Sequence, residues 1–149
     1  MLCADVNVLV DLVNRSGSRH GRVREWWNAV LASPETVLVP DFVAASFVRV
    51  VTDRRILPRP LTADHAFEFL DRVTEAPRVV LVPGSTAAWV RFRSLTSDLG
   101  LTGNDVPDAR LAAVALHLNA TVVSADRGFR RFPGIRVIDP AAPREDSPP

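Results

Sequence analysis

Short apolar runs alternate along the chain with longer segments of helical periodicity, and this alternation constrains the fold more than any other feature. The apolar runs are typical of buried strands, which we expect at 1–6, 36–40, 78–83, 121–125 and 135–139. We expect helices at 7–14, 19–33, 41–53, 61–76, 85–100 and 105–120. Strands that alternate with helices form parallel sheets with helices on both faces. The sequence therefore predicts an α/β fold, a parallel β-sheet sandwiched between α-helices.

The length of 149 residues fits one domain, which we place at 1–140, followed by a proline-rich tail at 141–149 that we expect to be disordered. Asp41 and Thr62 are the expected N-caps of their helices. The first residues do not have the pattern of a signal peptide, and no apolar run approaches the ~18 residues of a membrane span. A single cysteine, Cys3, excludes an internal disulfide framework, and we expect a cytoplasmic protein.

The net charge of +1 neither favours nor excludes a nucleic-acid partner, but all 18 basic residues are arginines. The planar guanidinium suits phosphate recognition, although a GC-rich genome would give the same bias. The arginines gather at 15–24, 49–59 and 127–131. These clusters either flank a groove for a polyanion or lie on solvated faces.

Three aspartates stand where strands end or a helix begins. Asp5 lies near the end of the first strand, Asp126 just follows the strand at 121–125, and Asp108 opens the helix at 105–120. Ligands of open α/β sheets bind beyond the carboxyl ends of the strands. We therefore expect these three carboxylates to meet at one edge of the sheet.

Carboxylates gathered in a site of low dielectric repel one another unless a cation lies among them. Oxygen ligands without histidine or cysteine suit Mg²⁺, for which Mn²⁺ can substitute, and such an ion supports hydrolysis of phosphodiester bonds. Other readings remain open, because Asp105 also suits a helix cap and Asp126 a turn before Gly128.

Other candidate sites are weaker. His20, His65 and His117 lie on separate predicted helices without a shared spacing, and Cys3 is typical of a small buried side chain. The sequence has no phosphate-binding glycine loop of the known patterns. The Trp26–Trp27 pair fits the core and an interface better than a platform for stacking bases.

Three segments, "ADVNVLVDLVN", "VPDFVAASFVRVVTDRRILPRPLT" and "TGNDVPDARLAAVALHLNATVVSADRGFRRFPGIRVIDP", carry a family likeness. The chain resembles the VapC toxins, PIN-domain ribonucleases of type II toxin–antitoxin systems, over about residues 2–140. The resemblance implies a PIN-like fold, with Asp5, Asp108 and Asp126 as catalytic residues and metal ligands. It also implies that Asn7 and Asn104 support the site.

The sequence departs from the family pattern at two positions. Ser46 stands where many PIN domains have a glutamate, and Gly128 where many have a further acid two residues after the Asp126 position. Asp105 is an additional acid nearby that would compensate. The resemblance thus leaves open whether one or two metal ions bind.

The resemblance further implies an Mg²⁺-dependent endoribonuclease that inhibits translation and growth. A VapB-like antitoxin, a homodimer and a heterotetramer or larger complex with the antitoxin are the implied partners and assemblies. We expect Arg49, Arg54 and Arg55 to contact RNA near the mouth of the cleft. Two alternatives are a catalytically weak RNA-binding module that blocks translation by occupancy, and a receiver-like signalling domain, which would normally need a lysine that this chain lacks.

Overall fold

Five parallel strands form one sheet in the order β3-β2-β1-β4-β5 in the computed structural model, which describes residues 1–143. The strands are β1 (Leu2–Ala4), β2 (Val37–Pro40), β3 (Val79–Val82), β4 (Thr121–Val123) and β5 (Val137–Ile138). The central strand β1 pairs Cys3 with Leu38 on one side and with Val122 on the other. The predicted parallel sheet is confirmed.

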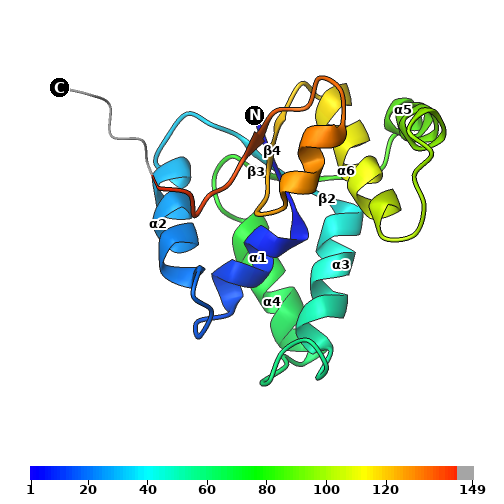
Figure 1. Ribbon diagram of the computed structural model, residues 1–149. Coiled ribbons are helices and arrows are strands. Elements are labelled where there is room, and N and C mark those ends of the chain that lie inside the picture. Colours follow the sequence, from blue (N-terminus) through cyan, green and yellow to red (C-terminus); the bar gives the residue numbers. More distant parts are fainter. Residues whose placement is uncertain (144–149) are drawn as a thin grey trace.

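Six α-helices and one 3₁₀ helix connect the strands (Figure 1). They are α1 (Val6–Val13), α2 (His20–Leu31), α3 (Asp41–Thr52), α4 (Ala63–Thr74), α5 (Thr86–Asp98), α6 (Asp105–His117) and η1 (Arg127–Arg131). Parallel crossovers are right-handed, so the helices between β1 and β3 lie on one face of the sheet and those between β3 and β5 on the other. The pairwise packing agrees, since α1 contacts α2 and α3, whereas α5 packs on α6.

The strand order reverses direction between β1 and β4. The chain moves from β1 outward through β2 to β3, then returns to the other side of β1 for β4. Ligands of open α/β sheets bind at such a switch point, beyond the carboxyl ends of the two strands. Asp5 and Asp126 both lie at this position in the chain, after β1 and after β4.

Small side chains bring α6 close to the sheet. Ala109, Ala112 and Ala115 are fully buried, as are the rings of Phe47, Phe129 and Phe132. Phe129 and Phe132 hold η1 against the core with their ring centroids 6.1 Å apart. Both α6 and η1 are therefore fixed next to the switch point by buried contacts.

The structure corrects one helix cap and qualifies the domain boundary. Thr62 caps α4 as predicted, but the N-cap of α3 is Pro40, and Asp41 is the first helical residue. The Asp41 carboxylate accepts hydrogen bonds from the Phe42 and Gly84 N–H groups instead, so it ties α3 to the segment after β3. Ala141, the first residue of the predicted tail, is buried, and residues 144–149 lie outside the described residues.

Candidate active site at the switch point

Asp5 joins β1 to α1 and stands at the centre of a hydrogen-bond network. Its backbone N–H donates to the Val123 carbonyl of β4 at 3.0 Å, which extends the pairing of the two strands by one residue. One carboxylate oxygen caps α1 by accepting from the Val6 N–H at 2.6 Å. The other accepts from the Asn7 amide and the Ser124 hydroxyl, each at 2.7 Å. The carboxylate is thus held by bonds that prefer its charged form.

Ser124 links the two strands at the switch point, and the sequence interpretation missed it. It is the one buried polar side chain in the described core, and its oxygen accepts from the Asn7 amide and the Asp126 N–H, each at 2.9 Å. Asn7 in turn accepts a hydrogen bond from the Ala125 N–H. The available signal was a serine directly after the apolar run "TVV", at the same strand end as Asp126.

Asp126 caps η1 and is held by a close backbone contact. Its carboxylate accepts from the Gly128 N–H at 2.7 Å. A Cβ on Gly128 would lie 2.9 Å from the same oxygen, closer than real Cβ atoms approach. The glycine therefore leaves room for the Asp126 carboxylate in its observed orientation.

Asp108 lies in the first turn of α6, where a guanidinium from η1 meets it. Arg131 donates to Asp108 at 2.9 Å and to Asp105 at 2.8 Å, so one arginine bridges both acids. The bridge connects α6 to η1, the helix that follows Asp126. Asp105 is the first residue of α6, with Asn104 as the N-cap residue, and the exposed Asn104 side chain makes no capping bond.

The pKa values of Asp5 and Asp108 show the electrostatic effect of neighbouring carboxylates. Burial, followed by the charges of Asp126 and Asp5, raises the pKa of Asp108 to about 6, against a lowering by Arg131. Burial also raises the pKa of Asp5, and the Asp126 charge adds to this despite the hydrogen bonds from Ser124 and Val6. Asp5, Asp108 and Asp126 thus form one cluster with negative charge in excess, which we call the carboxylate site.

The donors of the carboxylate site fit a hard divalent cation, because they are oxygens, and because burial and neighbouring negative charge raise the pKa values of Asp5 and Asp108. Within residues 1–143, however, no three His, Cys, Asp or Glu side chains are already arranged around a common ion position. Asp5 is engaged by Asn7 and Ser124, while Arg131 holds Asp108. A bound ion would therefore compete with Arg131 for the Asp108 carboxylate, of which the arginine holds Oδ2.

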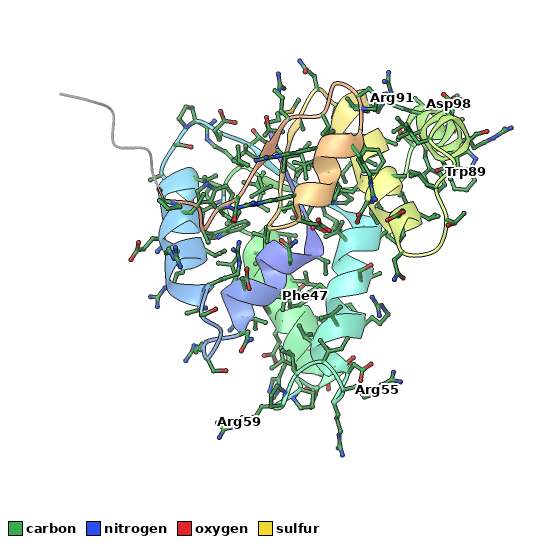
Figure 2. All side chains as sticks on the ribbon, in the orientation of Figure 1. Phe47, Arg55, Arg59, Trp89, Arg91 and Asp98 are labelled. Atoms are coloured by element: carbon green, nitrogen blue, oxygen red, sulfur yellow. The ribbon has the colours of Figure 1, made fainter. Side chains whose placement is uncertain are left out.

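The remaining predicted residues lie along α3 and beyond its end. Ser46 is half-buried on α3, which packs against α1. Arg49 and Arg54 are exposed, and Arg55 pairs with Asp53 at 2.9 Å. Figure 2 shows Arg55 at the tip of α3 remote from the sheet, and the 12-residue helix spans about 18 Å. The structure therefore does not bring Arg55 together with the carboxylates.

Two weaker candidates behave as ordinary structural residues. Cys3 is fully buried, and burial followed by the Asp5 charge raises the pKa of its thiol to about 12. Trp27 is buried and Trp26 packs against the core, as the sequence predicted. No helix in residues 1–143 is both long and apolar enough to cross a membrane.

Comparison with known proteins identifies related chains. The family model described as the PIN domain matches residues 2–135. Ribonuclease VapC43 of Mycobacterium tuberculosis is 41% identical over 136 residues, which cover 91% of this chain and 92% of that protein. Ribonuclease VapC31 of the same species is 36% identical over 140 residues, with 94% and 99% coverage.

Solved structures share the fold at lower identity. VapBC2 from Rickettsia felis, bound to a DNA fragment from its promoter, aligns with a TM-score of 0.70 and 18% identity over 92% of this chain and 96% of that one. VapC20 of Mycobacterium tuberculosis, described as a toxin that cleaves the sarcin–ricin loop, aligns with a TM-score of 0.68 and 16% identity over 91% and 99%.

Proposed function

The chain belongs to the PIN-domain family and, within it, to the VapC ribonucleases, and from this premise we propose that it is the toxin of a type II toxin–antitoxin system. Its activity is hydrolysis of RNA phosphodiester bonds as an endoribonuclease, which inhibits translation and growth. PIN-domain ribonucleases generally depend on a divalent metal, and we propose Mg²⁺ for this chain, with Mn²⁺ as a substitute.

The carboxylate site is the observation that carries this proposal. Asp5, Asp108 and Asp126 come from three separate segments, and at the switch point of the sheet the Asp126 charge raises the pKa of both Asp5 and Asp108. Carboxylates placed only for stability would be paired with cations, whereas Asp5 and Asp126 have no ion-pair partner among residues 1–143. A cluster of perturbed acids at the ligand-binding edge is instead typical of an active site.

Each residue has a distinct task in the proposed reaction. Asp5, Asp108 and Asp126 hold the cation, which when bound lowers the pKa of a water and offsets the charge that develops on the phosphate. Ser124 and Asn7 keep the Asp5 carboxylate in one orientation through their hydrogen bonds. Arg131, once released from Asp108, is placed to contact a phosphate. Asn104, Asp105 and Ser46 remain proposed supporting residues.

We propose a VapB-like antitoxin as the partner, a homodimer as the toxin's own assembly, and a heterotetramer or larger complex with the antitoxin. The support is that VapBC2 of Rickettsia felis, whose structure is bound to a DNA fragment from its promoter, shares this fold. Action in the cytoplasm follows from the proposed RNA substrate.

Cleavage of RNA in vitro tests the proposal. The wild type should cut single-stranded RNA in the presence of Mg²⁺, and EDTA should stop the cleavage. Asp5→Asn or Asp108→Asn should reduce the cleavage rate by at least a hundredfold, which corresponds to a loss of about 3 kcal/mol of transition-state stabilisation. Glu68→Gln is the matched control, since Glu68 is an exposed acid on α4. RNA binding without metal-dependent cleavage would instead favour the occupancy alternative.

A further inference from the structure

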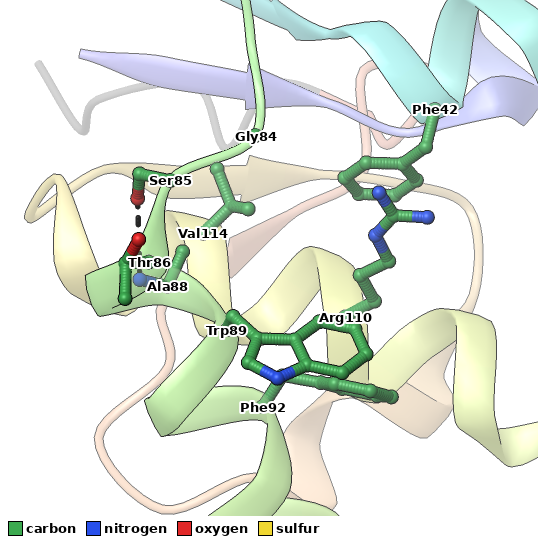
Figure 3. Close-up of a pocket in the computed structure, with 9 residues that line it drawn as sticks. All are labelled: Phe42, Gly84, Ser85, Thr86, Ala88, Trp89, Phe92, Arg110 and Val114. Carbon is green, nitrogen blue, oxygen red and sulfur yellow. Dashed lines mark hydrogen bonds between the residues drawn. The ribbon is translucent and has the colours of Figure 1, made fainter.

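A cavity of about 280 Å³ opens between α3, α5, α6 and the segment that joins β3 to α5 (Figure 3). Its walls include Phe42 of α3, Trp89 and Phe92 of α5, and Arg110 of α6, with Gly84 at the rim. The volume lies just below the ~300 Å³ at which sites for small organic ligands begin. The cavity, which we call the base cavity, therefore suits one planar group rather than a larger ligand.

Aromatic faces and a free cation line the base cavity. The Trp89 side chain is 55% exposed, and its ring lies 5.4 Å from Phe92 at a tilt of 49°. The Arg110 guanidinium carbon lies 4.1 Å from the centroid of the Phe42 ring. Among residues 1–143 no carboxylate forms an ion pair with Arg110. An exposed indole and a guanidinium without a carboxylate partner, lining the same cavity, are typical of a surface on which bases stack.

The base cavity lies on the same edge of the sheet as the carboxylate site. Phe42 follows the end of β2, and Gly84 follows the end of β3. Arg110 comes two residues after Asp108 on α6. Because β2 neighbours β1 at about 5 Å, the base cavity and the carboxylate site lie beyond adjacent strand ends, so that one strand of RNA can span both.

We propose that the base cavity receives one unpaired nucleobase of the RNA substrate, stacked on Trp89, next to the phosphate that is cut. The proposal deepens the proposed function and rests on it. Single-stranded RNA is recognised by splayed bases that stack on aromatic rings and arginine planes. Trp89 and Arg110 are thus specificity-determining residues, which position the substrate relative to the carboxylate site.

The nucleobase fits this cavity better than an apolar peptide side chain would. A peptide anchor would use the rings but would leave the Arg110 charge desolvated without a counter-ion. A nucleotide brings both a planar base for Trp89 and a phosphate within reach of Arg110. An antitoxin side chain and a second copy of the chain are the occupants that the test below separates.

Binding of a labelled single-stranded RNA 12-mer tests the proposal in an Asp108→Asn background, which prevents cleavage. Trp89→Leu should weaken binding about 5- to 100-fold, the loss of one base stack, while Trp89→Phe keeps most of the affinity. Phe67→Leu, at a 54% exposed ring on α4, is the matched control and should bind like the parent. Equal affinities for Trp89→Leu and the parent would overturn the proposal.

Removal of one base at a time identifies the partner of Trp89. An abasic ribonucleotide at one position of the 12-mer should weaken binding to the parent but not further weaken binding to Trp89→Leu. If the losses of binding free energy from the abasic site and from Trp89→Leu added up when the two changes were combined, the proposal would be overturned, because the ring and that base would then act independently.

Two further measurements separate the other occupants. A change of oligomeric mass in Trp89→Leu, with RNA binding intact, would assign the cavity to an interface between copies. Intact RNA binding with lost neutralisation by a co-expressed VapB-like antitoxin would assign it to the antitoxin. Either result overturns the proposal but leaves the proposed function in place. Absence of RNA cleavage by the wild type, by contrast, would remove the proposed function itself.

Discussion

The central residue of the site is Asp108, whose carboxylate shares its surroundings with three other acids and one arginine. With its pKa raised to about 6, the metal-free folded chain holds a proton there at pH 5 that the unfolded chain, with an ordinary carboxyl, releases. The free energy of unfolding of the metal-free protein therefore falls as pH rises from about 4 to about 6. This pH dependence comes from the burial of Asp108 and from the negative charges around it.

We expect the same titration to affect metal binding, because Asp108, as a proposed ligand, must lose its proton first. We predict that the Mn²⁺ dissociation constant falls about tenfold per pH unit below 6 and levels off above about 7. In Arg131→Ala the midpoint should move to higher pH, since the guanidinium lowers the pKa of Asp108. Titration calorimetry between pH 5 and 8 measures both. An affinity independent of pH in this range would remove Asp108 from the ligand set.

The site also depends on the absence of a Cβ at Gly128. Gly128→Ala would force the Asp126 carboxylate to move, because the new Cβ would lie 2.9 Å from its oxygen. We predict at least a tenfold loss of RNA cleavage with little loss of stability. Gly21→Ala is the control, since nothing lies within 4 Å of that Cβ on α2, and it should stabilise the chain by about 0.5–1 kcal/mol. Full activity of Gly128→Ala would show that the Asp126 orientation is unimportant.

At the scale of elements, α6 connects the core to both functional regions. It carries Asp108 into the carboxylate site and Arg110 into the base cavity, while Ala112 is fully buried beneath them. We predict that Ala112→Leu destabilises the protein by about 1–3 kcal/mol through overpacking and lowers RNA cleavage as well. Ala87→Leu on the exposed side of α5 is the control. Urea denaturation and cleavage assays are the measurements, and unchanged stability of Ala112→Leu would contradict the packing described here.

The elements themselves were predictable because each follows a local rule. Apolar runs such as "TVLVP" became strands, and Thr62 capped α4 as expected. The prediction failed by one residue at Asp41, where the carboxylate binds the Gly84 N–H, a partner distant in sequence. Ser124 and the Arg131 bridge were missed for the same reason, since both depend on side chains brought together only by the folded sheet.

At the scale of the whole molecule, the arginines of the second cluster remain a proposed extension of the RNA path. Arg49 and Arg54 are exposed on and after α3, which begins at the edge that carries the site. We predict that Arg49→Ala lowers the log–log salt slope of RNA binding by about one, and that Arg54→Ala, next to Arg55 at the end of α3 remote from the sheet, lowers it less. Arg136→Ala is the control, because Arg136 precedes β5 and lies at the opposite edge of the sheet. Unchanged slopes would exclude this cluster from the RNA path.

Mapping of RNA 5′ ends in cells after induction tests whether the three carboxylates make this chain an endoribonuclease. Wild type should arrest growth and create new RNA 5′ ends at few sites. Asp5→Asn and Asp108→Asn, expressed at equal levels, should do neither, whereas Glu68→Gln should act as the wild type does. If the wild type arrested growth without new 5′ ends, RNA cleavage would not be the cause of the arrest. If folded Asp108→Asn produced new 5′ ends at the same sites, the carboxylates would not be needed for cleavage.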